Sequence, residues 1–251
     1  WESVYIPANT DGFALLPSSD IDRYLDAQIV NEKGEFLTHC DTHAPCMLQK
    51  PAEGLYYVGL QSYEYIASPS VVAAWAGSKG GTLENGGLLP DVDVLPGQQL
   101  LESFYIPANT DAFMVAASND RDNARYAVLN AQGTMVKDCS GYREGCLLSQ
   151  PAAGVYYILV DNRFGSSWND TYTSVDVMAA WNGKMAAGLK NGVTTKLTTP
   201  SAGKMRIKSF YVPANTTGIA VMTQGEFRLG YTSVTNVDGT SVAGGCESYT
   251  P

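Results

Sequence analysis

The strongest constraint on the fold of this chain is an internal repeat, because a repeated segment has to fold in the same way at each occurrence. Residues 2–11 read ESVYIPANTD, residues 102–111 read ESFYIPANTD, and residues 208–217 read KSFYVPANTT. The copies lie about 100 residues apart in a chain of 251 residues, well beyond the roughly 20–50-residue periods of solenoid repeats. This spacing indicates duplication of a whole domain.

The similarity continues along the first two copies. Residues 51–58, PAEGLYYV, correspond to residues 151–158, PAAGVYYI, and both copies end on an Ala-Ala-Trp sequence. A pair of cysteines precedes the Gly-x-Tyr-Tyr segment in each of them. We therefore expect two complete units and a partial third unit that holds N-terminal strands alone, with the bounds 1–99, 100–206 and 207–251.

Short apolar segments separated by turns predict an all-β fold. The segments are rich in Val, Ile, Tyr, Phe and Thr, and none carries the sustained 3.6-residue apolar period and caps of a helix. The 25 glycines and 12 prolines suit a protein with many turns. Two packed antiparallel sheets are the usual way to build about 100 residues of short strands. We therefore predict tandem antiparallel β-sandwich domains of jelly-roll type, the third of them incomplete.

Several of these motifs together resemble the bacterial pre-peptidase C-terminal domain, abbreviated PPC below. They are a first strand that ends in a proline turn, an Asp-x-Asp turn at Asp20 and Asp22, a glycine hairpin, and residues 54–58, GLYYV. The resemblance implies a jelly-roll-like sandwich of secreted proteins, found beside peptidases or in adhesive and matrix proteins. Some PPC relatives bind calcium, collagen-like peptides or glycans. Paired cysteines are not a general feature of that family, so they would mark a subgroup.

The third copy lacks the second cysteine, the Gly-x-Tyr-Tyr segment and the Ala-Ala-Trp segment. Half a sandwich exposes its apolar face and its sheet edges to water, which is unfavourable. Three interpretations stay open: the native chain continues, the end is disordered or degraded, or another subunit supplies the missing strands. The last of these predicts a head-to-tail polymer. Because the sequence begins with Trp1 rather than methionine, we also expect further sequence upstream.

Five cysteines in a chain that we expect to be exported point to disulfides. Cys40 and Cys46 lie close together in the first copy, as do Cys139 and Cys146 in the second, and we predict a local disulfide within each pair. Cys246 aligns with the first cysteine of each pair. We therefore expect it to be unpaired, with its partner beyond the last residue.

Zinc is the alternative for the first cysteine pair, because His39 and His43 lie beside Cys40 and Cys46 and zinc prefers such ligands. The second copy keeps both cysteines but has no histidine in its loop. A disulfide explains both loops and zinc explains one, so the comparison of the copies favours the disulfide.

Acidic turns are candidate calcium sites, because hard cations prefer clustered oxygen ligands. Asp also suits turns for backbone reasons, so a purely structural role is the competing interpretation. A further acidic pair, Asp91 and Asp93, lies near the first linker. The candidate calcium ligands in the turns are Asp20, Asp22, Asn119, Asp120 and Asp122.

The second copy has a longer loop than the first between its Tyr-Tyr segment and its Ala-Ala-Trp segment. The loop carries Phe164, Trp168 and Tyr172 among glycine and serine residues. Aromatic side chains in such a loop can stack on sugar rings or anchor a partner protein, and packing beneath the loop is the competing interpretation.

Charge and motifs exclude several classes of function. A formal charge of -9 disfavours binding to nucleic acid, and no apolar run approaches the length of a membrane span. The two histidines share one cysteine loop, and no nucleophile, nucleotide-binding or metalloprotease motif is present. We therefore expect no catalytic residues and no enzymatic activity.

What remains is a structural or adhesive role outside the cell. We expect a secreted or surface protein of a bacterium, such as a matrix protein, an adhesin or a filament subunit, whose partners are copies of itself or other extracellular proteins. The alternative is an accessory module of a secreted hydrolase that binds a peptide or a glycan.

Overall fold

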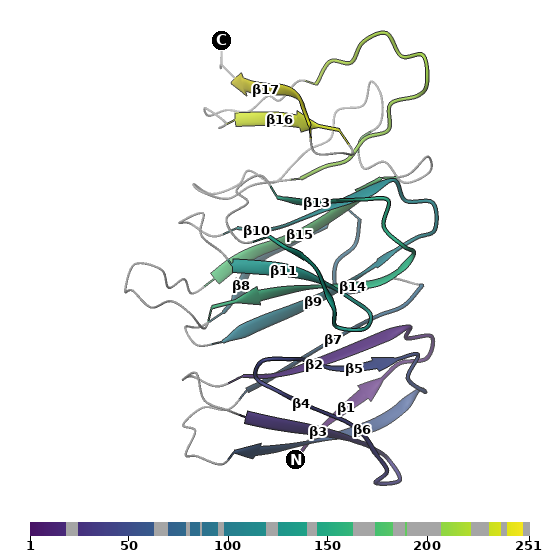
Figure 1. Cartoon of the computed structure of the whole chain (residues 1–251), viewed down its shortest axis with the longest axis vertical. Coiled ribbons are helices and arrows are strands. Elements are labelled where there is room, and N and C mark those ends of the chain that lie inside the picture. Colours follow the sequence, from purple (N-terminus) through teal and green to yellow (C-terminus); the bar gives the residue numbers. More distant parts are fainter. Residues whose placement is uncertain are drawn as a thin grey trace.

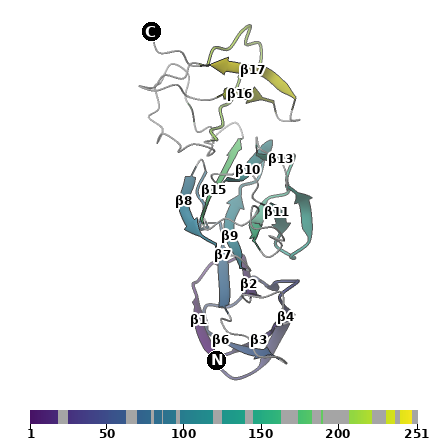
Figure 2. The ribbon, with the colours of Figure 1, turned by 90° about the vertical axis from the view of Figure 1, so that its left-hand side faces the viewer.

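The computed structural model describes residues 1–18, 25–62, 70–78, 81–85, 87–94, 98–118, 125–139, 145–162, 174–182, 189, 207–221, 231–236 and 240–247. Every regular element in these ranges is a β-strand, and the strands of each sheet pair antiparallel. The predicted all-β fold of antiparallel sheets is thereby confirmed. The three repeat units, called modules below, follow one another along the long axis of the molecule (Figures 1 and 2).

The first module is a sandwich of two sheets. Its strands are β1 (Glu2–Ile6), β2 (Gly12–Ser18), β3 (Leu25–Asn31), β4 (Phe36–Asp41), β5 (Cys46–Gln49), β6 (Gly54–Ser62) and β7 (Ser70–Ala76). The larger sheet has the order β1-β6-β3-β4 and the smaller has the order β5-β2-β7. Successive side chains of a strand point to opposite faces of its sheet. One of the two alternating sets, which includes Phe13, Ile29 and Val58, forms the core between the sheets.

The second module repeats this arrangement. Its strands are β8 (Gly87–Asp93), β9 (Gln99–Ile106), β10 (Ala112–Ser118), β11 (Arg125–Asn130), β12 (Met135–Asp138), β13 (Cys146–Ser149), β14 (Gly154–Asp161) and β15 (Ser174–Asn182). The order β9-β14-β11-β12 corresponds to the larger sheet of the first module, and β13-β10-β15 corresponds to the smaller sheet. Aromatic contacts of Phe104 with Phe113, Tyr156 and Trp181 lie at the centre of the core.

The structural boundary between the first two modules lies before strand β8, earlier than the boundary of the sequence repeat. The sequence repeat assigns residues 87–93 to the first unit, yet β8 pairs with β15 in the second sandwich. Leu83 and Val94, on either side of β8, are buried in the core of the second module. The predicted boundary at residue 99 therefore marks the repeat in the sequence and not the fold. Addition of β8 covers an edge of the smaller sheet, which would otherwise expose unpaired backbone groups.

The turn after the first strand is built in the same way in each module. Asn9, Asn109 and Asn215 have φ angles of 63°, 64° and 64°, in the left-handed region that asparagine tolerates better than most residues. The threonine that follows donates a hydrogen bond from its hydroxyl to the carbonyl of the proline in the turn, over 2.7–2.8 Å. In the complete modules this turn carries the chain from one sheet to the other, which explains why Pro-Ala-Asn-Thr recurs.

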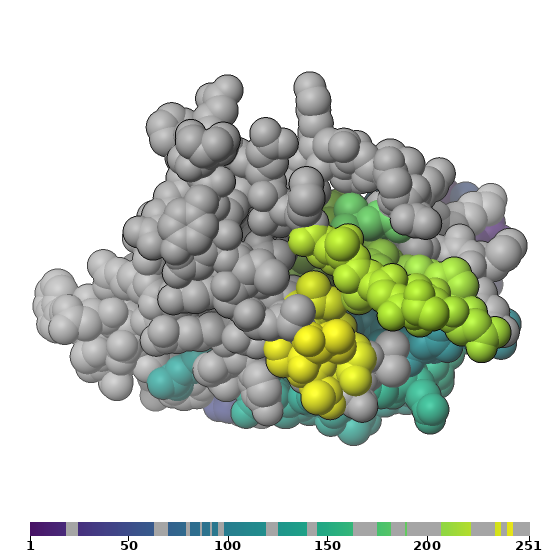
Figure 3. All heavy atoms as spheres, turned by 90° about the horizontal axis from the view of Figure 1, so that it is seen from above, coloured from purple at the N-terminus to yellow at the C-terminus, as the bar shows by residue number. Residues whose placement is uncertain are grey.

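The third module is described in part, and Figure 3 looks down on its end of the molecule. The strands β16 (Tyr231–Thr235) and β17 (Ser241–Glu247) form an antiparallel pair. Ile219 is 46% exposed, whereas Phe13, its equivalent in the first module, is fully buried. Val212 is likewise exposed where Ile6 is buried. In its described residues, therefore, the third module exposes positions that form the core of a complete module.

Candidate functional site: the junction between modules

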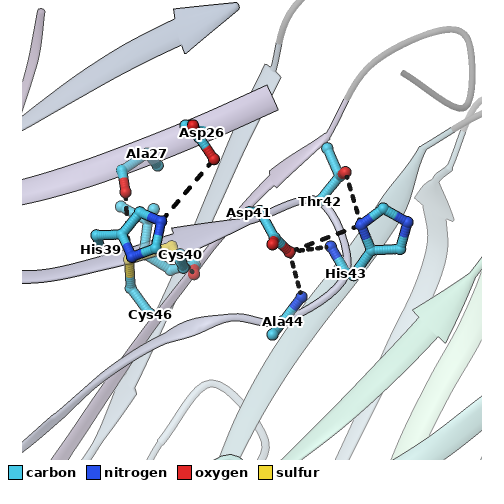
Figure 4. Close-up of polar contacts among 10 residues, drawn as sticks. Asp26, Ala27, His39, Cys40, Asp41, Thr42, His43, Ala44 and Cys46 are labelled. Carbon is cyan, nitrogen blue, oxygen red and sulfur yellow. Dashed lines mark hydrogen bonds and ion pairs between the residues drawn. A yellow bond between two sulfur atoms is a disulfide. The ribbon is translucent and has the colours of Figure 1, made fainter. Parts of the chain in front are cut away.

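The two predicted disulfides are present. Cys40 is bonded to Cys46, with sulfur atoms 2.10 Å apart, and Cys139 is bonded to Cys146, with sulfur atoms 2.03 Å apart. In the first module the bond links β4 of the larger sheet to β5 of the smaller sheet (Figure 4). All four cysteines are buried in the cores of their modules. Each bond therefore ties together the two layers of a sandwich.

The histidines at the first disulfide loop lie near carboxylates. His39 Nε2 lies 3.9 Å from Asp26 Oδ1, and His43 Nδ1 lies 3.7 Å from Asp41 Oδ1 (Figure 4). Asp41 Oδ1 also accepts hydrogen bonds from the backbone N–H groups of His43 and Ala44, which fixes the turn. Because both cysteine sulfurs are used by the disulfide, neither is free to act as a thiolate ligand for zinc.

Several predicted site residues lie outside the described part of the chain. They are the candidate calcium ligands Asp20, Asp22, Asn119, Asp120 and Asp122, and the loop aromatics Phe164, Trp168 and Tyr172. Calcium and loop-mediated binding therefore stay predictions. The backbone of Cys246 lies in β17 opposite Thr232, but its side chain is outside the described set, so its unpaired state also stays a prediction. Among the described residues no helix is long and apolar enough to cross a membrane.

A shallow hollow opens beside His39 on the larger sheet of the first module. It has a volume of about 330 Å³ and is lined by backbone and side chains of β3, β4 and β6. Polar groups of Asp26, Gln28 and Gln61 and the exposed ring of Phe36 face the same space. An aromatic ring beside amide and carboxylate groups is a combination that suits a sugar or a short peptide.

The junction between the first and second modules is an apolar contact that sequence reasoning did not foresee. The smaller sheet of the first module faces the larger sheet of the second, and β7 lies against β9 (Figure 2). The first module contributes small side chains and the second contributes large ones. The buried residues of this cluster are Ala14, Ala74, Ala76, Leu101, Leu129, Val155 and Tyr157. The two modules therefore share a common core in addition to the core that each has of its own.

Ser103, in strand β9, forms the polar part of the junction. Ser103 Oγ donates a hydrogen bond to the carbonyl oxygen of Trp75 over 2.7 Å, and the carbonyl of Ser103 accepts one from Leu83 N over 2.9 Å. Both bonds recur at the next junction. Ser209 Oγ donates to the carbonyl of Trp181 over 3.1 Å, and Leu189 N donates to the carbonyl of Ser209 over 2.8 Å. The hydrogen bond from serine to the tryptophan carbonyl therefore joins the second and third modules as it joins the first and second.

Two polar groups are buried close to the first junction. Burial raises the pKa of Glu102 to about 7, and a hydrogen bond from Thr82 opposes part of that rise. The hydroxyl of Tyr157 is buried without a hydrogen-bond partner among the described residues, and burial raises its pKa above the ordinary value. Gly12 leaves room for this hydroxyl, because a Cβ at position 12 would lie 2.8 Å from Tyr157 Oη.

A signal for the junction was present in the sequence. The strand 154–160, GVYYILV, is apolar on both of its faces, and strands that are buried on both faces read as continuous apolar runs. The structure buries Val155 and Tyr157 on one face of β14 and Tyr156 and Ile158 on the other. That run indicates a second covering layer in addition to the sandwich partner.

The fold and the junction define a class: a protein of tandem β-sandwich modules that stack face to face through a repeated contact. Comparisons of the sequence with models of protein families and with curated proteins found no match. Membership of the PPC family therefore stays a prediction that rests on the motifs described above.

Proposed function

We propose that this chain is a non-catalytic extracellular structural protein in which PPC-like modules are stacked into a stiff rod, as in a matrix protein, an adhesin or a filament subunit. The supporting observation is the repeated junction. Domains joined by a linker move relative to one another unless their interface is large and apolar. Here an apolar cluster and the hydrogen bond from Ser103 to the carbonyl of Trp75 hold the first pair of modules, and the equivalent bond from Ser209 to Trp181 recurs at the second pair.

Several further features suit an extracellular spacer. Each complete module carries a buried disulfide, and disulfides persist in oxidising compartments. The charge of -9 favours solubility of a long molecule. Stacking of equivalent modules separates the two ends of the chain, so that an adhesive surface at one end is presented at a distance from the other.

The rod extends by completion of the third module. Its described residues expose Val212 and Ile219, positions that are buried in the first module. The larger sheet of a complete module places the Gly-x-Tyr-Tyr strand between its first strand and the strand equivalent to β16. A strand of this type from another copy would fill that place and pair on both of its edges, as in strand complementation. Repeated from copy to copy, this head-to-tail contact builds a filament.

Solution scattering tests the rod. The full chain should give the profile of an extended rigid particle. Ala74→Glu, which places a charge in the shared core, should give the profile of modules that move independently, because an unpaired buried charge opens the contact. Ala153→Glu is the matched control, since residue 153 is exposed and the first module carries Glu53 at the equivalent position. A flexible profile for the unaltered chain would overturn the rod.

Electron microscopy and sedimentation test the assembly. Filaments with a longitudinal repeat equal to the length of the stacked modules would support completion by another copy. A soluble monomer at all concentrations, together with a native protein whose intact mass shows that the chain continues past residue 251, would assign the missing strands to the same chain instead.

The alternative function is that of an accessory module that binds a peptide or a glycan for a secreted hydrolase. The hollow beside Phe36 and His39 favours it, because it combines an exposed ring with convergent polar groups. Binding of the full chain to an array of glycans and collagen-like peptides tests this role. Loss of the signal in Phe36→Ala would place the ligand in the hollow, and unchanged binding in that variant would exclude the hollow as its site.

A further inference from the structure

The larger sheets of the first two modules have equivalent outward faces. Strand pairing defines the equivalence: Ser3 lies opposite Tyr57 as Ser103 lies opposite Tyr157, and Val30 lies opposite Tyr57 as Leu129 lies opposite Tyr157. In the second module this face meets the first module. In the first module the corresponding residues form what we call the leading face: Trp1, Ser3, Tyr5, Val30, Leu55, Tyr57 and Gly59.

The leading face is apolar and open, whereas its counterpart is covered. Tyr57 is 37% exposed and Trp1 is 73% exposed, while Tyr157 and Leu101 at the equivalent positions are 0% and 1% exposed. Tyr5 and Leu55 add further exposed apolar area on the same two strands. Contiguous apolar patches of this kind on soluble proteins mark surfaces that bind another molecule.

The leading face stays apolar although Trp1 and Gly59 differ in size from their counterparts in the second module. Its indole ring lies against Gly59, where an added Cβ would approach the ring to 2.8 Å. The second module has Leu101 and Leu159 at these two positions, and both belong to the shared core. The large ring and the missing side chain in the first module thus compensate for one another, as do volume-conserving changes in a core.

Ser3 supplies the polar group of the same contact. At both observed junctions the equivalent serine donates its hydroxyl proton to a tryptophan carbonyl and accepts a hydrogen bond from the N–H of a leucine. Ser3 is exposed, and the described residues offer no counterpart to either bond. The two Ala-Ala-Trp strands of the chain are already bound by Ser103 and Ser209.

We propose that the leading face is a docking site for another β-sandwich module of the kind found in this chain, which presents a small-residue sheet and a last strand ending in Ala-Ala-Trp. At both junctions of the described residues, the equivalent serine binds the Ala-Ala-Trp strand of the preceding module in this way. The inference deepens the proposed rod, because it names the partner of its first module. The incoming module would place its alanines against Tyr57 and Leu55 and its tryptophan carbonyl at Ser3.

The test extends the full chain at its N-terminus. Residues 81–206, which include β8 and Leu83 of the second sandwich, are placed directly before residue 1, because Ile207 and Trp1 occupy the same position before the repeated serine. Oxidation by hydroxyl radicals, located by mass spectrometry, then reports the exposure of Trp1, Tyr5 and Tyr57. We expect their oxidation to fall severalfold in the extended chain, with Tyr57 approaching the reactivity that Tyr157 has in the unextended chain. Oxidation of Tyr211 in the third module should not change.

A matched variant shows whether protection comes from docking. Ala180→Glu in the added module alone, at the position equivalent to Ala74, should restore the oxidation of Tyr57, because it charges the docking sheet. Low oxidation of Tyr156, which lies in the core of its own sandwich in both copies of the module, reports that the added module is folded. A second extension, with residues 1–100 before residue 1, presents Trp75 in place of Trp181 and repeats the test with another donor.

Unchanged oxidation of Trp1, Tyr5 and Tyr57 in folded extended chains would overturn the proposal. So would protection that persists after Ala180→Glu. Neither result affects the scattering profile of the unextended chain, which tests the rod. Failure of the docking site and failure of the proposed function are therefore distinguishable.

Discussion

Tyr57 and Tyr157 allow the junction to be measured against an internal control. Both are tyrosines at the same place in the strand pairing, but Tyr157 is fully buried and Tyr57 is 37% exposed. Replacement of a fully buried aromatic side chain by alanine costs about 3–5 kcal/mol, because apolar contact is lost and a cavity is left. Tyr57→Ala should cost about 1–2 kcal/mol, since part of its ring is already hydrated and water fills the space. The difference, about 2–3 kcal/mol, is the part that comes from the junction.

Urea denaturation of the full chain, followed by circular dichroism, measures this difference. With an m-value of about 2 kcal/mol/M, Tyr157→Ala should move the midpoint down by about 2 M and Tyr57→Ala by less than about 1 M. Scattering at low urea should show independent modules in the Tyr157 variant and an unchanged rod in the Tyr57 variant. Equal midpoint shifts for the two variants would refute the conclusion that the second module depends on the first for part of its core.

Three further predictions concern single groups. Tyr157→Phe should leave stability unchanged or raise it by up to about 1 kcal/mol, because the buried hydroxyl has no partner among the described residues; a clear loss in urea denaturation would contradict this. Because burial raises the folded-state pKa of Glu102 from 4.5 to about 7, its contribution to stability is full below pH 4.5 and is lost as the pH rises through 7. Tm should therefore fall over that range, and Glu102→Gln should flatten the dependence; equal slopes would contradict it. Replacement of Cys40 and Cys46 by alanine should lower the free energy of unfolding by about 2 kcal/mol, the value expected for a disulfide that closes so short a loop. Calorimetry without reductant should show a lower Tm for this variant, and an unchanged Tm would contradict the prediction.

Patterns that are local or repeated were predictable from the sequence. The strands around Phe13 and Phe113 follow from short apolar segments between turns, and the disulfides follow from paired cysteines that occur twice. Repetition was decisive for the disulfides, because a loop with histidines and a loop without them required one explanation. The structure agrees in both loops.

Contacts between modules were harder to predict, because the same residue types serve the core and the junction. Leu101 and Tyr157 read as core residues of their own sandwich, and Ala14 and Ala74 read as ordinary small strand residues. The sequence signal for strand β8 is weak for another reason. Pro90 lies within it, and proline weakens a strand prediction except at a sheet edge, where its missing N–H is tolerated.

The repeated first strand acquires a physical explanation from these contacts. Its inward residues, Phe104 and Ile106 in the second module, are buried in the core of their own sandwich. Its outward residues, Ser103 and Tyr105, face the preceding module, and the sandwich itself places no demand on them. An isolated sandwich would accept any polar residue there, yet all three copies carry serine and tyrosine at these positions. The first module keeps this pair at Ser3 and Tyr5 on an open face, which is the pattern expected of a strand selected to receive another module.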